Sequence, residues 1–374
     1  NVDGKGASYG AHENYLVKRS LDFTTLAQQL MPFFVTRTVY TGAGRVGIGT
    51  TSQAAGFQIS QRADYIETDI SLETTLNRGL INTRDEPHAD ADMWRRLHVI
   101  VGDANMSEVA TYLKVGLTML VIIAIEAGVD FSDLVLADPV EAVKAVSRDL
   151  TLQVPLPLLS GGEMTALDIQ EQYRSRVYAF LYGKREPHVP AMSPHHSCFS
   201  KERTEDLCTW WKKVLKDLRS DPMATSHYLD WTAKLALLTK LQERYQCGWD
   251  DARLTALDFS YSDLRPSGIY NKLVAAGRMR LMVDEAAVRT AVTHAPTTTR
   301  AWLRGALVEK FGSAIVAESW DSISVAGPND GVYTLRIGDP LSLGEANCAP
   351  IVDNEDNPET ILRRVSSELL EGER

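Results

Sequence analysis

Two short stretches of this sequence place histidines beside other polar side chains at a spacing of two residues. His12 and Asn14 have this spacing in "AHENYL", and Arg96 and His98 have it in "RRLHVIV". Side chains two residues apart share one face of a β-strand, so each stretch offers a polar pair to one side. Guanidinium groups bind phosphate oxygens, and imidazoles bind divalent metal ions. The two pairs predict a metal and nucleotide site on one face of a sheet.

Two more arginines fit the same chemistry. Arg62 follows Ser60 in "SQRADYIE", and Arg84 opens the acidic stretch "RDEPHADAD". Magnesium prefers oxygen ligands, so histidine is an uncommon ligand for it, although imidazole also suits Mn²⁺. The alternative is a purely structural one, in which the histidines only make hydrogen bonds within the fold and the acidic stretch is a solvated loop.

Other motifs carry less weight. "GAGRVGIG" at 42–49 fits a glycine-rich phosphate loop in spacing, but no helix pattern follows to receive a pyrophosphate. "HHSC" at 195–198, with Cys208, offers nitrogen and sulfur donors for zinc, although adjacent histidines in a proline-rich stretch usually face water. The sequence contains neither the Ser-His-Asp order nor the G-x-S-x-G motif that is typical of serine hydrolases.

The elements that would position these residues change character along the chain. Residues 6–102 are rich in strand patterns, and "NMSEVATYLKVGLTMLVIIAIEAG" at 105–128 predicts a capped helix that ends at a glycine. Further helix patterns cover 139–149, 165–182, 203–219 and 230–246, and 184–202 is predicted to be a surface insertion. Residues 296–374 combine helix and strand patterns. We expect an α+β fold with a catalytic domain at 1–295 and a small α+β domain at 296–374.

Composition narrows the class of protein. The 374 residues carry a formal net charge of −10, which argues against binding nucleic acid through its phosphates. The four cysteines form no disulfide framework, so we expect a cytoplasmic protein. The longest apolar run, 115–125, is too short to span a bilayer and predicts a core helix, so no membrane partner is expected.

Four stretches resemble a known family: "GKGASYGAHENYL", "GFQISQRADYIE", "LINTRDEPHADADMWRRLHVIVGDANMSE" and "TTTRAWLRG". They are similar to the Pup ligase/deamidase family, which is related to glutamine synthetase and other carboxylate–amine ligases. The resemblance covers nearly the whole chain except 184–202. It implies a glutamine synthetase-like antiparallel sheet packed with helices. "NVDGKGASYG" and "RVGIG" resemble the amidase branch rather than the ligase branch.

The resemblance also implies an activity. The amidase branch uses ATP and Mg²⁺, deamidates the C-terminal Gln of Pup to Glu, and cleaves the isopeptide bond between Pup and lysine in the bacterial proteasome pathway. Pup and pupylated proteins would be the partners. Two alternatives remain: the Pup-protein ligase of the same family, and a catalytically incomplete module that only binds nucleotide or Pup.

Roles for individual residues follow from the same resemblance. His12 and His98 would be metal ligands. Asn14, Arg96 and Trp320 would bind the nucleotide, and Arg62 and Arg84 would act on the γ-phosphate and the reacting carbonyl. The family's segment with a metal-binding glutamate and a catalytic aspartate has no counterpart in these 374 residues. We therefore expect the nucleophilic Asp on a separate N-terminal segment of the same enzyme.

Overall fold

The computed structural model describes residues 2–73, 76–183, 200–327 and 331–370. The chain divides into two compact units, one of Asn1–Asp85 and Arg96–Met282, and one of Glu86–Arg95 and Val283–Arg374. The expected boundary after residue 295 therefore differs from this division in two places. The short stretch at 86–95 joins the second unit because its backbone bonds to distant residues. Asp90 donates its N–H to the carbonyl of Gly338 at 3.2 Å, and the carbonyl of His88 accepts from Arg300 at 2.7 Å.

A four-stranded sheet carries the polar pairs of the first unit. Its order is β1 (Glu13–Lys18), β6 (Trp94–Val99), β5 (Gly79–Asn82) and β4 (Thr68–Ser71). The expected antiparallel pairing holds for β5 and β6, where Asn82 lies opposite His98. β4 and β5 pair in parallel, so the sheet is mixed. Both pairing modes have the same two-residue alternation, and the sequence pattern therefore does not distinguish them.

A buried helix interrupts the region that was expected to be rich in strands. α1 (Phe23–Thr36) begins at Asp22, whose side chain accepts the backbone N–H of Thr25, and α2 (Thr38–Thr41) follows it directly. From Leu30 to Thr36 every residue of α1 is buried, and Pro32 lies within the helix. Its exposed residues Thr24, Thr25 and Gln28 all lie in the first half, so the amphipathic pattern is too short to have predicted the helix.

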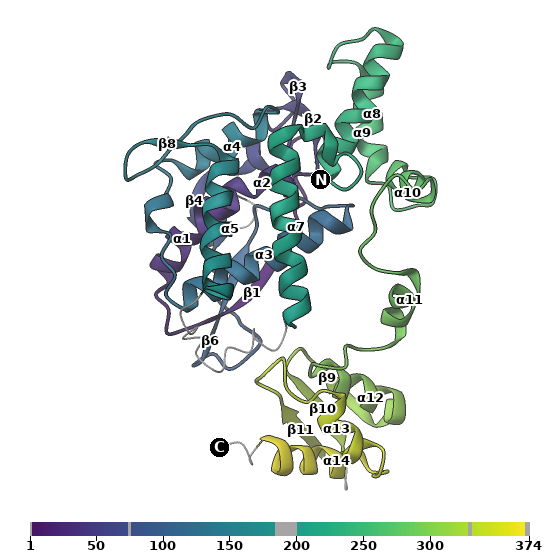
Figure 1. Ribbon diagram of the computed structural model, residues 1–374. Coiled ribbons are helices and arrows are strands. Elements are labelled where there is room, and N and C mark those ends of the chain that lie inside the picture. The colour runs from purple at the N-terminus through teal and green to yellow at the C-terminus, as the bar shows by residue number, and fades with distance from the viewer. Residues whose placement is uncertain (1, 74–75, 184–199, 328–330, 371–374) are drawn as a thin grey trace. The chain divides into compact units, whose positions relative to one another are not determined.

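The central helix α3 (Glu108–Glu126) confirms the predicted core helix. Ser107 caps it by accepting the N–H of Ala110. By length and composition α3 is apolar enough to cross a membrane, but 72% of that window is buried inside the protein, as in the core helix of a soluble protein. Figure 1 shows α5 and α7 packed alongside it, and α1 contacts it as well.

Four more helices of the first unit agree closely with the predicted ranges: α4 (Pro139–Arg148), α5 (Ala166–Tyr182), α7 (Lys201–Ser220) and α8 (Asp230–Tyr245). Two helices that were not predicted follow them, α9 (Ala252–Tyr261) and α10 (Ile269–Ala275). Two hairpins complete the unit: β2 (Arg45–Ile48) with β3 (Ala54–Gln58), and β7 (Leu156–Pro157) with β8 (Glu163–Met164). "GAGRVGIG" thus leads into a hairpin and not into a helix. Most of the predicted insertion, 184–199, lies outside the described residues.

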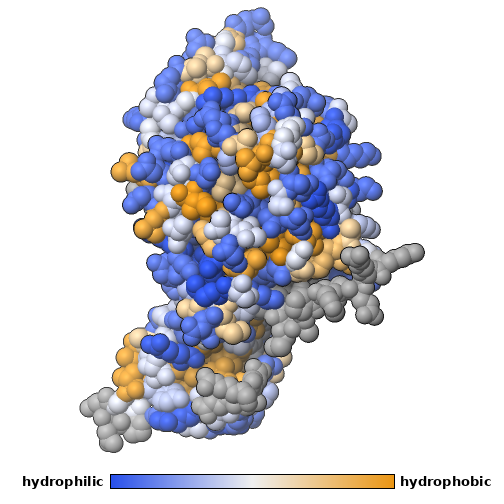
Figure 2. Space-filling model, turned by 90° about the vertical axis from the view of Figure 1, so that its left-hand side faces the viewer, coloured by the Kyte–Doolittle hydropathy of each residue, from blue (hydrophilic) through white to orange (hydrophobic). Residues whose placement is uncertain are grey.

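The second unit is a small α+β fold, as expected for the C-terminal region. Its strands β9 (Ile315–Glu318), β10 (Ser322–Ala326) and β11 (Val332–Arg336) form an antiparallel sheet in the order β11-β10-β9. Its helices are α11 (Glu285–Thr293), α12 (Ala301–Phe311), α13 (Glu345–Val352) and α14 (Pro358–Val365). A separate buried cluster that includes Leu303, Ile323 and Ile361 forms its core. On the face of the protein in Figure 2, hydrophilic and hydrophobic residues are interspersed.

Candidate active site

The two predicted metal-binding histidines lie side by side. His12 directly precedes β1, His98 belongs to β6, and these two strands are neighbours in the sheet. His98 Nε2 lies 3.2 Å from His12 Nδ1, and the two rings are 5.1 Å apart. His98 is 6% exposed, whereas His12 is open to solvent. The pair thus presents one exposed imidazole supported by one buried imidazole.

Asn82 on β5 orients the buried histidine. Its Oδ1 accepts the backbone N–H of Arg84 at 2.9 Å and lies 3.2 Å from His98 Nδ1. Because Oδ1 is an acceptor, His98 Nδ1 carries the proton in the neutral pair, and His98 Nε2 then accepts from His12 Nδ1. In the other tautomer of His12, with the proton on Nε2, the lone pairs of His98 Nε2 and His12 Nδ1 are both available to a metal ion. Asn82 was not among the predicted site residues, because only the cross-strand register brings it to His98.

The histidine pair fits two neighbouring ligands of one divalent ion. Two nitrogens each ~2.1 Å from a metal ion and at adjacent coordination positions lie about 3 Å apart, close to the observed 3.2 Å. Among the residues that the structure describes, no group of three or more His, Cys, Asp or Glu could hold a metal ion. The histidine pair would therefore offer only nitrogen ligands, and a magnesium ion would take its oxygens from phosphate, water or other groups.

Arg62 lies behind the histidine pair and is fully buried, at 1% exposure. Its Nε donates to the carbonyl of Ile100 at 3.1 Å, and its Nη1 donates to Ser8 Oγ at 2.9 Å. Gly10 makes room for it, because a Cβ at that position would lie 2.5 Å from the guanidinium carbon. Within the described residues no hydrogen bond to Nη2 is seen, so this nitrogen can meet a ligand.

Partial burial and the nearby Arg62 disfavour the protonated form of His12. Partial burial lowers the pKa of His12, and the positive charge of Arg62 lowers the pKa further. Burial also lowers the pKa of Arg62, while the attraction of Asp103 opposes that shift. A neutral imidazole keeps the lone pair that metal binding requires.

Arg84 and Arg96 meet where β5 and β6 lie next to each other. Arg96 Nε donates to the carbonyl of Arg84 at 3.3 Å. The carboxylate of Asp85 accepts the Arg96 backbone N–H at 3.0 Å and pairs with Arg19 at 2.9 Å. The side chain of Arg84 is exposed and that of Arg96 is half-buried. Arg19, Arg84 and Arg96 thus lie near one another beside β6, in a chain whose net charge is −10.

Glu13 explains the polar triplet in "AHENYL". It points into the core, opposite to the exposed Asn14, and its Oε2 accepts from Arg37 Nη1 at 2.9 Å. Arg37 also donates to Thr118 Oγ1 at 2.6 Å, and Tyr15 donates its hydroxyl to Glu13. The strand therefore carries His12 and Asn14 outward and is anchored inward by a buried ion pair.

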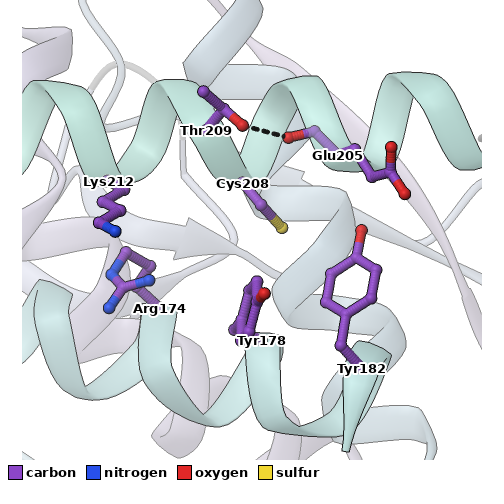
Figure 3. A pocket seen from close by; sticks show the side chains of 7 residues that line it. All are labelled: Arg174, Tyr178, Tyr182, Glu205, Cys208, Thr209 and Lys212. Carbon is purple, nitrogen blue, oxygen red and sulfur yellow. Dashed lines mark hydrogen bonds between the residues drawn. The ribbon is translucent and has the colours of Figure 1, made fainter.

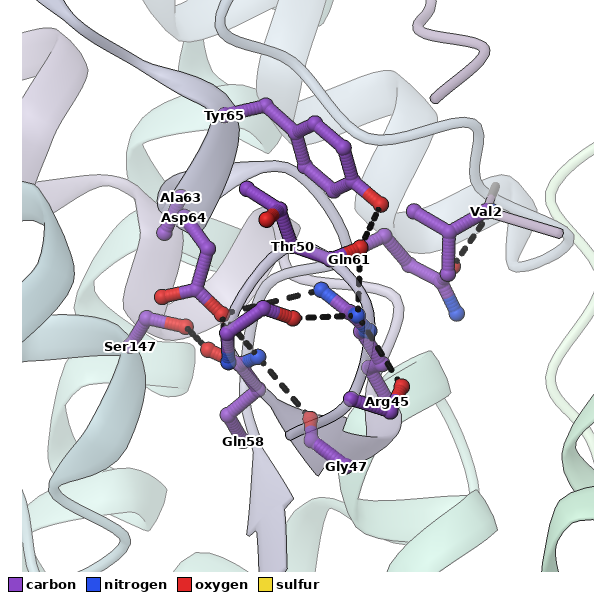
Figure 4. Close-up of polar contacts among 12 residues, drawn as sticks. Val2, Arg45, Gly47, Thr50, Gln58, Gln61, Ala63, Asp64, Tyr65 and Ser147 are labelled. Atoms are coloured by element: carbon purple, nitrogen blue, oxygen red, sulfur yellow. Dashed lines mark hydrogen bonds and ion pairs between the residues drawn. The ribbon is translucent and has the colours of Figure 1, made fainter. Parts of the chain in front are cut away.

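A second buried network surrounds Asp64 (Figure 4), two residues after Arg62. Asp64 accepts from Gln58 Nε2 and from the backbone N–H of Gly49, both at 2.7 Å. Arg45 lies 3.6 Å from the same carboxylate and donates to the carbonyl of Gly49 at 2.6 Å. Burial alone would raise the pKa of Asp64, but hydrogen bonds from Gln58 and Arg148 lower it below its usual value.

Trp320 belongs to the other unit of the chain, and three of the four zinc candidates lie outside the described residues. Trp320 belongs to the second unit, is 69% exposed, and has its ring 6.2 Å from that of His88. Of the zinc candidates, His195, His196 and Cys198 lie outside the described residues. Cys208 is buried in a groove of about 640 Å³ between α5 and α7, lined also by Tyr178 and Lys212 (Figure 3). These helices carry none of the predicted site residues.

Comparison with known proteins decides the family. Residues 1–324 match the family model described as "Pup-ligase protein". The chain belongs to the Pup-ligase family. Among members of this family, it is 46% identical over 368 residues to a Pup deamidase/depupylase of Mycolicibacterium smegmatis, covering 98% of this chain and 71% of that protein. It is 42% identical over 314 residues to a Pup-protein ligase of Pseudarthrobacter chlorophenolicus, covering 83% and 65%.

A solved structure of the Pup-ligase family shares the fold. The Pup ligase PafA in complex with ADP matches with a TM-score of 0.80 at 35% identity, covering 94% of this chain and 75% of that one. The expected α+β architecture is thereby confirmed. The recognition of the family from "GAHENYL" and the 81–108 stretch is confirmed as well.

Proposed function

We propose that this protein is a Pup amidase that uses ATP and Mg²⁺. It would deamidate the C-terminal Gln of Pup and cleave the isopeptide bond that joins Pup to lysine. The observation that carries the proposal is the 46% identity over 98% of the chain to a relative named Pup deamidase/depupylase. The similarity to the named ligase is weaker, 42% over 83% of the chain. Pup and pupylated proteins are the proposed partners, and the cytoplasm is the proposed compartment.

The site supports this chemistry through its positive groups. His12 and His98 would hold the divalent ion, which when bound neutralises phosphate charge. The ADP complex of the related ligase supports nucleotide binding in this family, and Asn14 and Arg96 are the residues proposed to hold the nucleotide here. Arg62 and Arg84 would stabilise negative charge on the γ-phosphate and on the carbonyl oxygen. Groups fixed before the reaction stabilise such charge without reorganising, and this effect is usually large.

Of these groups, Arg62 has the side chain whose position is most firmly fixed by hydrogen bonds. Its guanidinium is held at two nitrogens, by Ile100 and Ser8, before any ligand binds. Its burial strengthens its interaction with an oxyanion, because the surrounding dielectric is low. Arg84 is exposed and would close onto the substrate from solvent. The aspartate nucleophile on a separate N-terminal segment and the nucleotide contact of Trp320 stay predictions.

Cleavage of a conjugate tests the proposal against the ligase alternative. The protein, expressed from its complete reading frame, is incubated with ATP, Mg²⁺ and a Pup–protein conjugate, and free Pup is followed by gel and mass spectrometry. Release of Pup ending in Glu supports the amidase. Stable conjugates, together with new conjugates formed from free Pup ending in Glu and a lysine-bearing protein, would identify a ligase instead.

A further inference from the structure

The carboxylate of Asp103 occupies a buried position at the centre of the site's supporting loops. It is 2% exposed and lies four residues after the end of β6. From this position we infer that Asp103 is a positioning residue for Arg62. The inference rests on the proposed function for the part that Arg62 has in turnover, and on geometry alone for the position of Arg62.

Both carboxylate oxygens of Asp103 accept hydrogen bonds from two other segments of the chain. Oδ2 accepts the backbone N–H of Ala43 and that of Gln61, each at 2.8 Å. Oδ1 accepts the hydroxyl of Ser60 at 2.9 Å and the backbone N–H of Arg62 at 3.2 Å. Hydrogen bonds to an ionised carboxylate are stronger than those between neutral groups. One side chain thus fixes the turn on which Arg62 is carried.

Ser60 connects Asp103 to the backbone of the same turn. While its hydroxyl donates to Asp103, its oxygen accepts the backbone N–H of Arg62 at 3.0 Å and that of Ala63 at 3.1 Å. The Arg62 backbone N–H is therefore shared between the carboxylate and the hydroxyl. This arrangement sets where the side chain of Arg62 leaves the backbone.

The side chain of Arg62 returns to the segment that carries Asp103. Its Nε donates to the carbonyl of Ile100, three residues before Asp103. Lys114 holds that segment from α3, because its Nζ donates to the carbonyl of Asp103 at 2.8 Å and to Asn105 Oδ1 at 2.9 Å. Both ends of Arg62 are thus tied to residues 100–103, and the negative charge of Asp103 lies close to the buried guanidinium.

The chain offers a matched control in Asp230. This carboxylate is also fully buried, and it accepts from the backbone N–H groups of Met106 and Ser107 and from the hydroxyl of Tyr261, at 2.9–3.1 Å. It holds the start of α3 and does not contact Arg62. Asp103→Asn and Asp230→Asn therefore make the same change of carboxylate to amide at two buried sites, and only the first touches the turn of Arg62.

The test compares the two variants in protein expressed from its complete reading frame. We expect both to lower the unfolding temperature. We expect Asp103→Asn to lower kcat for Pup deamidation by about 10²-fold, the loss that a misplacement of ~1 Å produces, with the KM for ATP changed less than about 3-fold. Asp230→Asn is expected to keep kcat within about 2-fold. Equal losses of kcat in the two variants, or an unchanged kcat in Asp103→Asn, would overturn the inference.

A second readout separates this inference from the proposed function. Arg62 Nε–H, assigned by NMR through its loss in Arg62→Lys, should exchange slowly with water in the wild type and faster in Asp103→Asn. If the wild type does not act on Pup, the proposed function fails, and the exchange rate still tests the position of Arg62. If Asp103→Asn does not fold, Ser60→Ala replaces it with the same two readouts. Unchanged protection of Arg62 Nε–H would refute the positioning role.

Discussion

Replacing Arg37 with methionine should destabilise the protein strongly, because Arg37 is the partner of the buried carboxylate between His12 and Asn14. Arg37 is 1% exposed and follows the end of α1. It donates to both oxygens of Glu13 and to Thr118 Oγ1, and its guanidinium lies 4.7 Å from the ring centre of Phe34. Arg37→Met keeps much of the side-chain volume and removes the charge.

The expected magnitude follows from what the change leaves behind. Removing one partner of a buried ion pair costs about 3–5 kcal/mol, because the other charge stays buried without compensation. Glu13 is 7% exposed and would keep Tyr15 as a neutral donor. Proteins are stable by only about 5–15 kcal/mol, so this loss is a large fraction of the total. The double variant Glu13→Gln/Arg37→Met removes both charges and should recover part of the loss.

Urea unfolding followed by tryptophan fluorescence measures these differences in the free energy of unfolding. Arg265→Met is the control, because its pair with Asp263 is exposed and such a pair contributes about 0–1 kcal/mol. A loss below ~1 kcal/mol for Arg37→Met would refute the reasoning. So would a double variant that is no more stable than Arg37→Met, since the unpaired carboxylate of Glu13 would then not be the cause.

Three further predictions concern the proposed site. His12→Ala and His98→Ala should each weaken binding of ATP with Mg²⁺ in calorimetry while circular dichroism stays unchanged, and unchanged affinity in both would remove them as metal ligands. Arg62→Ala and Arg84→Ala should lower kcat more than nucleotide affinity, whereas a loss confined to affinity would make them simple anchors. The pKa of His12 is lowered, so NMR should show it titrating below the usual histidine range, and Arg62→Gln should raise that pKa. Because the pKa of His12 is lower in the folded protein, the unfolded chain binds a proton at this residue more readily. The contribution of His12 to the free energy of unfolding should therefore decrease as the pH falls below the usual histidine range. A free energy of unfolding that stays constant over that pH interval would contradict this prediction.

Alternation along two strands was enough to predict one face of the site. The exposed Asn14 and the buried Glu13 follow the period of two, and so does the core face of β6 at Leu97 and Val99. The partners across the fold were not predictable in this way. Arg37, Asn82 and Asp103 reach the site only through tertiary packing.

The missed elements have the same physical origin. The second half of α1 is fully buried, so a polar face is confined to its first half and the helical pattern is short. The stretch 86–95 joins the second unit through backbone hydrogen bonds, to which the sequence gives no guide. The direction in which β4 pairs with β5 depends on the chain connection, and strand composition does not reveal it.

The proposal that this member of the Pup-ligase family is an amidase is tested most directly by deamidation without a lysine acceptor. The protein, expressed from its complete reading frame, is given ATP, Mg²⁺ and Pup ending in Gln, and the C-terminal peptide of Pup is analysed by mass spectrometry. We expect conversion of the C-terminal Gln to Glu with release of one ammonia for each Pup. Pup that keeps its C-terminal Gln, while Pup ending in Glu is joined to added lysine-bearing protein, would contradict it.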